Sequence, residues 1–304
     1  MRRYSSRFSR HDFTQVQLMA LLMFKTKMRM RYREIVDFIS ICPKMMKILK
    51  LCKIPHYTTL NKFFLRTGSS LFEKLLGRSV RLFDISNPWI AIDATGHSSD
   101  YASRHYEHRI RRKRKNYSKN SIAVDTKTQA ILAQRARKGP RHDSIDADAL
   151  IRKCRRLRPE GFSLDKGYDC ERIHRIIREE LDAESQIPQR IGMAKSGKYR
   201  KMMLFGLIRE KYNRRSIAET VNSVEKRIFG EENRSRSERT RNKETKLRNV
   251  CYNVYVRARA LSNVLVIAFE GFYRAKIENS GKNEYKLEYD KFVLGDDEDG
   301  SLLA

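Results

Sequence analysis

The chain has 304 residues, of which 65 are lysine or arginine and 36 are aspartate or glutamate, so its formal net charge is +29. Such a surplus indicates a polyanionic partner, and nucleic acid and anionic membranes are the commonest polyanions. A hydrophobic content of 40% is enough for one substantial core or two modest ones, which excludes wholesale disorder. A role confined to small acidic metabolites would not need so much positive charge.

The sequence has no apolar run long enough for a signal peptide or a membrane-spanning helix, and the run Val264–Phe269, for example, is short enough for a buried helix or strand. We therefore expect a soluble protein of the cytoplasm, associated with the nucleoid, and no membrane partner. The five cysteines are scattered, and neither they nor the seven histidines have the spacing of a zinc site. Any metal ion is expected to be bound by carboxylates.

Residues 1–85 are predicted to form a small all-helical domain. Hydrophobic residues recur at three- and four-residue intervals over 13–66, with an interruption at Pro43. A short helix is expected after the segment 54–57, capped by Thr58 or Thr59. Three short helices of this kind are typical of a helix-turn-helix that binds DNA, and almost as typical of a helical packing module.

Residues 86–275 are predicted to form a mixed α/β domain. The apolar run Trp89–Ile92 is typical of a buried strand that ends at Asp93. Two further runs, Ser121–Asp125 and Ala130–Ala133, predict a hairpin. Other patterns predict a strand at 185–187 and helices over 143–157, 171–180, 212–229 and 246–269. The order indicates a central mixed sheet flanked by helices, and residues 276–304 are expected to form a polar, acidic tail.

The helix predicted over 212–229 has a polar side and an apolar side. At about 100° per residue, four polar residues fall within about 60° of one another. They are Tyr212, Arg215, Glu219 and Lys226. This pattern places a carboxylate between cations. Taken alone, it is more often an ordinary solvated helix face, on which Arg215 and Glu219 form an i,i+4 ion pair.

Two more carboxylates follow strand-like runs. Asp93 and Asp165 each come directly after an apolar segment, where the end of a strand brings a side chain to the rim of a sheet. With Glu219, they are a donor set that can hold two divalent ions and stabilise the attacking and leaving oxygens of a phosphoryl transfer. A single aspartate at the end of a strand is more often a turn residue or a helix cap.

The motif Tyr-x2-Arg-x3-Glu-x6-Lys that begins at Tyr212 resembles the signature of insertion-sequence transposases of the IS4/IS5 type, in the DDE class. The segment 90–96 resembles the strand of this family that carries the first aspartate. The segment 139–144 resembles the residues before its connecting helix, and the segment 164–169 resembles its second-aspartate motif. The resemblance extends over about residues 89–269 and, more weakly, into the helical head.

The resemblance implies an RNase H-like catalytic domain in which Asp93, Asp165 and Glu219 are the catalytic triad. By the same resemblance, the triad holds two Mg²⁺ ions, for which Mn²⁺ can substitute. Only 54 residues separate Asp165 from Glu219 (219 − 165), which leaves no room for the large β insertion domain that some IS4-type relatives carry.

The resemblance also implies that Tyr212, Arg215 and Lys226 contact DNA at the end of the element. The protein is then expected to be an endonuclease that binds terminal inverted repeats in double-stranded DNA, cleaves them and joins the ends to target DNA. Cut-and-paste transposition of this kind handles two ends together, so a homodimer is expected. Two alternatives stay open: a related nuclease without strand transfer, and a catalytically inactive, transposase-derived DNA-binding protein.

Other charged residues near these motifs have simpler interpretations or contact phosphates. The basic run that begins at Arg109 is longer than a solvated face needs, so we expect it to contact DNA phosphates. Its proposed contacts are Arg111, Arg112, Lys113, Arg114 and Lys115. A second patch of this kind is expected at 195–201. Capping or solvation explains the remaining acidic neighbours, which are Asp143, Asp146, Asp148, Asp169 and Glu225.

Overall fold

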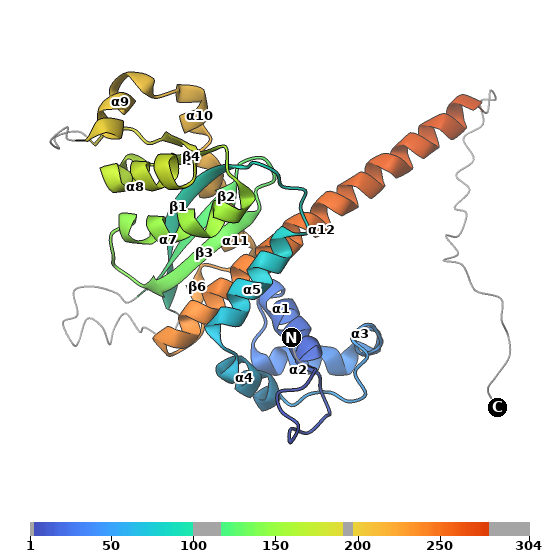
Figure 1. Ribbon diagram of the computed structural model, residues 1–304. Coiled ribbons are helices and arrows are strands. Elements are labelled where there is room, and N and C mark those ends of the chain that lie inside the picture. The colour runs from blue at the N-terminus through green and yellow to red at the C-terminus, as the bar shows by residue number, and fades with distance from the viewer. Residues whose placement is uncertain (1–2, 100–116, 191–196, 280–304) are drawn as a thin grey trace, which may run out of the picture. The chain divides into compact units, whose positions relative to one another are not determined.

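A computed structural model of the chain describes residues 3–99, 117–190 and 197–279, with side chains described as far as Leu261 (Figure 1). The chain divides into two units, Met1–Arg259 and Ala260–Ala304. The described part of the second unit is the C-terminal portion of one helix, and the fold of the first unit is described below. Among the described residues, no helix has the length and hydropathy that a membrane span requires.

The N-terminal part of the first unit is helical. It contains α1 (Gln15–Lys27), α2 (Tyr32–Ile41), α3 (Pro43–Ile48), α4 (Tyr57–Arg66) and α5 (Ser69–Val80). α1 begins with a capping box, in which the Thr14 hydroxyl accepts from the N–H of Gln17 and the Gln17 side chain accepts from the N–H of Thr14. The sequence therefore fixes the start of α1 locally.

The cap expected for α4 is wrong by two or three residues. His56 is its N-cap, and the imidazole accepts a hydrogen bond from the N–H of Thr58. Because the helix begins at Tyr57, Thr58 and Thr59 already lie in its first turn and cannot cap it.

The described residues form a six-stranded mixed sheet in the order β3-β2-β1-β4-β5, with β6 paired to the end of β1. The strands are β1 (Trp89–Ser99), β2 (Ser118–Asp125), β3 (Ile131–Lys138), β4 (Gly161–Leu164), β5 (Glu184–Gln186) and β6 (Glu232–Asn233). β1, β2 and β3 are antiparallel neighbours, whereas β4 runs parallel to β1, and β5 parallel to β4. This sheet and its flanking helices confirm the predicted mixed α/β class and agree with an RNase H-like domain.

The helices that follow the hairpin mostly differ from the predicted ones in their bounds, but α9 (Lys198–Gly206) was not predicted. They are α7 (Ser144–Cys154), α8 (Glu171–Arg175), α9 (Lys198–Gly206), α10 (Arg209–Asn213), α11 (Ser216–Phe229) and α12 (Glu238–Asn279). Single turns η1 (Arg155–Leu157) and η2 (Lys166–Tyr168) follow α7 and β4, and η3 (Ile176–Glu180) extends α8.

Two expectations are corrected. The strand that begins at Trp89 does not end at Asp93, because the backbone from Asp93 to His97 stays paired with β2. The helix expected over 212–229 is interrupted between Asn213 and Ser216, where the Ser216 hydroxyl donates to the carbonyl of Asn213 (2.9 Å). Short polar side chains that bond to nearby backbone groups compete with the helix in this way.

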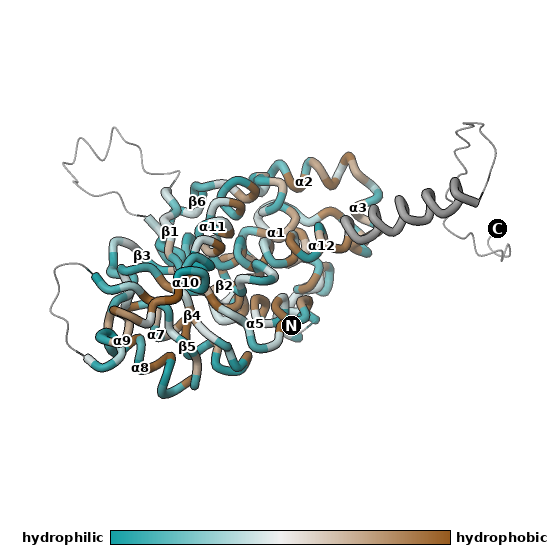
Figure 2. The backbone as a smooth tube through the Cα atoms, turned by 90° about the horizontal axis from the view of Figure 1, so that it is seen from above, coloured by the Kyte–Doolittle hydropathy of each residue, from teal (hydrophilic) through white to brown (hydrophobic). Residues whose placement is uncertain are grey.

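The sheet has a hydrophobic cluster on each face. Successive residues of β1 alternate between them: Ala91 belongs to the first cluster, and Ile90 and Ile92 belong to the second. The N-terminal helices α1–α5, which we call the helical head, share the first cluster with α11 and α12. α1 of the head is mainly hydrophobic (Figure 2). α7 and α8 contribute to the second cluster. The first core is thus continuous between the head and the sheet.

Lys243 of α12 binds the C-terminal end of α4. Its side chain is buried, and its ammonium donates to the carbonyls of Phe64 (2.9 Å), Leu65 (3.0 Å) and Thr67 (3.1 Å). The last carbonyls of a helix have no partner within the helix and form its negative end, so a cation is favoured there. Burial lowers the pKa of Lys243, yet these three acceptors compensate the buried ammonium.

We expect Lys243→Met to lower the free energy of unfolding by about 2 to 4 kcal/mol, because three carbonyls, two of them in buried hydrogen bonds, lose a charged donor. Urea denaturation followed by circular dichroism measures the change. Lys44→Met is the matched control at an exposed lysine. Equal midpoints for the two variants would show that the Lys243 contacts add no stability.

A buried polar cluster joins β1, α11 and α12. His97 Nε2 lies 3.6 Å from Glu225 Oε2, and the Arg248 guanidinium donates to the carbonyl of Gly230 (2.9 Å). Among the described residues, His97 Nε2 and both Glu225 carboxylate oxygens have no hydrogen-bond partner. Burial therefore raises the pKa of Glu225 to about 7 and lowers the pKa of His97 to about 3. The expectation that Glu225 is a solvated surface residue is wrong.

The two shifts act on stability in opposite directions. Folded Glu225 holds its proton more tightly than the unfolded chain, so its contribution to stability is lost as the pH rises from 4.5 to about 7. His97 holds its proton less tightly when folded, so its contribution grows as the pH rises from about 3 to 6.5.

We expect Glu225→Gln to remove only the loss of stability that Glu225 causes as the pH rises. The free energy of unfolding of the variant should gain roughly 3 kcal/mol on that of the wild type between about pH 4 and pH 8. Urea titrations at several pH values measure this difference, with Glu238→Gln, at an exposed carboxylate, as the control. A constant difference between variant and wild type would mean that Glu225 titrates normally.

Candidate active site

The parallel pairing of β1 with β4 brings two carboxylates together. Ile92 of β1 is the register partner of Leu164 of β4. Asp93 follows Ile92 and Asp165 follows Leu164, so the parallel pairing brings the two aspartates side by side. Neighbouring strands are about 4.8 Å apart. β4 ends at Leu164, and Asp165 precedes the turn η2. Both aspartates are half-buried.

The third predicted carboxylate, Glu219, lies in the first turn of α11. α11 packs against β1 and β2, and Asn222, one turn beyond Glu219, donates to Asp93 Oδ2 (2.8 Å). The negative charge of Glu219 also raises the pKa of Asp93. The fold therefore brings α11 and its Glu219 to the edge of the sheet that carries the two aspartates.

Burial is the main reason why the pKa of Asp93 is raised above its usual range. The N–H of Ala94 and the amide of Asn222 lower it in part, whereas the negative charges of Glu219 and Asp143 raise it further. A half-buried carboxylate among other carboxylates gains from a bound cation. The electrostatics at Asp93 thus favour a metal ion.

Arg215 lies between the candidate carboxylates and Tyr212. Its guanidinium forms an ion pair with Glu219 and stacks over the Tyr212 ring, 5.4 Å from the ring centroid. Partial burial lowers the pKa of Arg215, but the hydrogen bond to Glu219 and the nearby charges, including that of Asp165, outweigh it and raise the pKa. The fold thus brings Tyr212, Arg215 and Glu219 together, although Tyr212 belongs to α10 and not to the helix of Glu219.

The other predicted DNA-contacting residues have different positions. Lys226 lies about two turns beyond Glu219 on α11, and its ammonium is 3.2 Å from Glu231 Oε1. The basic run, with Arg111, Arg112, Lys113, Arg114 and Lys115, lies outside the described residues.

The carboxylates fit a divalent ion in chemical type, because Mg²⁺ prefers oxygen ligands and is bound through one or two carboxylates. Within residues 3–99, 117–190 and 197–279, no three acidic, histidine or cysteine side chains form a metal-binding group. At this site the carboxylate of Glu219 is paired with Arg215. Glu219 would have to exchange this partner in order to bind a metal ion together with Asp93 and Asp165.

Several residues of the site were missed or misjudged from the sequence. Asn222 was missed, although its position three residues after Glu219 places both on one side of a helix. Tyr168 was missed too: its hydroxyl is buried and has no hydrogen-bond partner within the part of the chain that the structure describes. Burial raises the pKa of Tyr168, and four carboxylates add to the effect: Asp143, Asp93, Asp146 and Asp165.

Two acidic residues expected to be solvated are buried in ion pairs. Asp146 binds Arg135 (3.0 Å) and Arg137, and it accepts from the Ser121 hydroxyl (3.1 Å). Asp169, four residues after Asp165, binds a buried arginine of α9. Their partners come from β2, β3 and α9, so the local sequence around each aspartate carries no sign of them.

A mixed sheet flanked by helices, with Asp93 within β1, Asp165 directly after β4 and Glu219 on a packed helix, is the arrangement expected of a metal-dependent phosphoryl-transfer domain. The family model of the transposase DDE domain matches residues 86–254, which is more than half of the chain. The chain therefore belongs to the family of transposases with this DDE domain, and its membership implies a nuclease or transposase that acts on DNA. A comparison with curated proteins gives no match.

We expect Asn222→Ala to move the acid limb of the pH–activity profile to higher pH. Without the amide donor, the pKa of Asp93 rises further, so the carboxylate becomes ionised only at higher pH. On the acid limb, the rate of Mg²⁺-dependent DNA cleavage by the variant should fall about tenfold. At high pH the rate should change little. Asn213→Ala, at an exposed asparagine, is the control. An unchanged acid limb would show that Asp93 does not limit activity at low pH.

Proposed function

We propose that the protein is the DNA transposase of an insertion sequence of the IS4/IS5 type. It binds the terminal inverted repeats of its element, hydrolyses a strand at each end and joins the free 3′-hydroxyl to target DNA. The observation that carries this proposal is the placement of Asp93 beside Asp165, with Glu219 on the helix that packs against the same strands.

In this proposal, Asp93, Asp165 and Glu219 are the catalytic residues and hold two Mg²⁺ ions, with Mn²⁺ as a substitute. When bound, the ions supply stabilisation of the attacking and leaving oxygens of phosphoryl transfer. Asn222 fixes the orientation of Asp93 through its hydrogen bond. Arg215 neutralises Glu219 in the absence of other cations, and a guanidinium released from Glu219 is well suited to bind a phosphate in two-point fashion.

The DNA contacts in this proposal follow from the charge. Tyr212, Arg215 and Lys226 contact the transposon end, and the basic run from Arg111 to Lys115 contacts phosphates. The net charge of +29 supports strong, salt-dependent binding to the DNA backbone. Two element ends are handled together, so two copies of the chain act as a homodimer on DNA, within the nucleoid.

A second candidate is a transposase-derived DNA-binding protein without catalysis. The ion pair between Arg215 and Glu219 favours it, because this pair occupies the third carboxylate. A nuclease that cuts without joining would use the same three residues. The assays below separate these candidates.

We expect Asp93→Asn, Asp165→Asn and Glu219→Gln each to reduce both cleavage and strand transfer by about a thousandfold, equivalent to about 4 kcal/mol. DNA binding should persist, because the substitutions keep the size of each side chain. The substrate is DNA that carries the inverted repeats flanking the gene, with Mg²⁺ added. Asp84→Asn, at an exposed aspartate outside the site, is the control and should retain full activity.

The outcomes separate the candidates. Cleavage without joining by the wild type identifies the nuclease. Binding without cleavage by the wild type identifies the inactive DNA-binding protein. Triad variants that cleave as well as the wild type would show that the three carboxylates are not the catalytic residues.

A further inference from the structure

An exposed face of α9 combines hydrophobic and basic side chains. Phe205 is 97% exposed and Met202 is 47% exposed. At about 100° per residue, they share an arc of about 100° with Lys198 and Lys201, which are also exposed. These four residues, Lys198, Lys201, Met202 and Phe205, form what we call the α9 face.

The opposite side of α9 is fixed to the fold. Arg200 binds the buried carboxylate of Asp169 through two hydrogen bonds, Nε to Oδ1 and Nη2 to Oδ2, each of 2.8 Å. Glu171 accepts from the N–H groups of Tyr199 and Arg200 (3.0 Å each) and so caps the helix. Gly197 is required before the helix, since its φ is +105° and a Cβ there would lie 2.3 Å from Glu171. The exposure of Phe205 is therefore not a consequence of a loosely attached helix.

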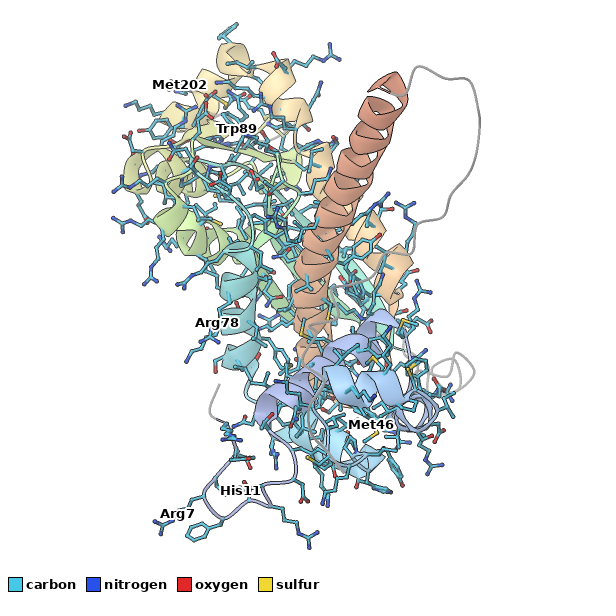
Figure 3. The ribbon with its side chains drawn as sticks, turned by 90° about the vertical axis from the view of Figure 1, so that its right-hand side faces the viewer. Arg7, His11, Met46, Arg78, Trp89 and Met202 are labelled. Atoms are coloured by element: carbon cyan, nitrogen blue, oxygen red, sulfur yellow. The ribbon has the colours of Figure 1, made fainter. Side chains whose placement is uncertain are left out.

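Residues on both sides of α9 in the chain connect it to the candidate active site. Asp169 lies four residues after Asp165 and is joined to it by η2. At the other end, α10 is bound to β4, where the Ser163 hydroxyl donates to the carbonyl of Lys211 (2.7 Å), and α10 leads to Arg215. Met202 lies at the same end of the molecule as Trp89 of β1, and Met46 of the helical head lies at the opposite end (Figure 3).

The charge of residues 198–215 indicates which kind of partner the α9 face binds. Residues 198–215 contain seven lysines and arginines and one glutamate, and four of these cations are paired with carboxylates: Arg200, Lys211, Arg214 and Arg215. The α9 face itself has two lysines and no carboxylate. Two copies of such a surface repel each other, whereas a polyanion is attracted. Hydrophobic side chains among phosphate-binding cations can insert between base steps and kink the duplex, and aromatic rings can stack on unpaired bases.

We propose that Phe205 inserts between bases of double-stranded DNA next to the candidate active site, while Lys198 and Lys201 bind the flanking phosphates. This inference rests on the proposed function, because it takes DNA as the substrate of the same site. It assigns to α9 the local unstacking of the DNA that the three carboxylates would cut. The helix is held by Asp169, so the inserted ring and Asp165 keep a fixed separation.

Binding to two DNA duplexes tests the proposal. The probes are a dye-labelled duplex of mixed sequence and the same duplex with a short central run of mismatches, which removes the cost of unstacking. We expect the wild type to bind the mismatched duplex about tenfold more tightly. Phe205→Ala should lose this preference, and Phe205→Trp should retain it. Phe8→Ala, at another exposed phenylalanine, should leave the preference unchanged.

The lysines have a separate expected effect. Lys198→Ala and Lys201→Ala should weaken binding to both duplexes by the same factor and should each reduce the slope of log affinity against log salt by about one. A loss of preference in these variants, with an unchanged salt slope, would contradict a role in phosphate binding.

The remaining outcomes overturn the inference in distinguishable ways. If Phe205→Ala keeps the preference, or if the wild type binds both duplexes equally, α9 does not insert into DNA and the proposed function is unaffected. If the wild type binds neither duplex, the proposed function fails as well. A change from dimer to monomer on Phe205→Ala in sedimentation, with DNA preference intact, identifies a second copy as the occupant. Binding to vesicles of phosphatidylglycerol that Phe205→Ala alone abolishes identifies a membrane.

Discussion

The parallel pairing of β1 with β4 is the contact on which the candidate site depends. It places two aspartates next to each other at a point where both are half-buried, and burial is the main reason why the pKa of Asp93 is raised. The negative charges of Glu219 and Asp143 raise this pKa further, and a bound cation would compensate them. The neighbouring structure supplies cations and donors around the site: Asn222 hydrogen-bonds to Asp93, Arg215 pairs with Glu219, and the overall charge of the chain is strongly positive.

The alternation of side chains along β1 explains how the rest of the molecule supports this contact. One face of the strand packs with α7 and α8, and the other packs with the helical head, α11 and α12. Ala218 and Val221, which flank Glu219 in the sequence, are buried in the first cluster, with the helical head and α12. Their burial sets the position of Glu219 relative to the sheet. The position of the third carboxylate is therefore set by hydrophobic packing on a face of the sheet, and the aspartates are set by strand pairing.

The parts of the fold that were predictable are those with local causes. Apolar runs marked the strands, and Asp93 and Asp165 were found because they end such runs. Glu219 was found through its spacing from Tyr212 and Arg215. The helix break before Ser216 was not found, because the residues from Tyr212 to Phe229 fit a single helix with a polar and an apolar side, and the side-chain hydrogen bond at the break has no periodic signature. Asp169 and Glu225 were misjudged because their burial depends on α9 and α12, whose positions no short segment of sequence encodes.

The continuous core between the helical head and the sheet has a geometric consequence. Lys243 and the hydrophobic cluster that includes Phe64 and Phe72 hold α4 and α5 against the body that carries the carboxylates. A head attached by a linker could search for DNA on its own, but this head turns only with the whole unit. Under the proposed function, any base pairs that the head contacts would lie at a set distance from Asp93 and Asp165. The distance between the recognised sequence and the proposed cut would then be fixed by the fold of this unit, as a set number of base pairs along the DNA axis.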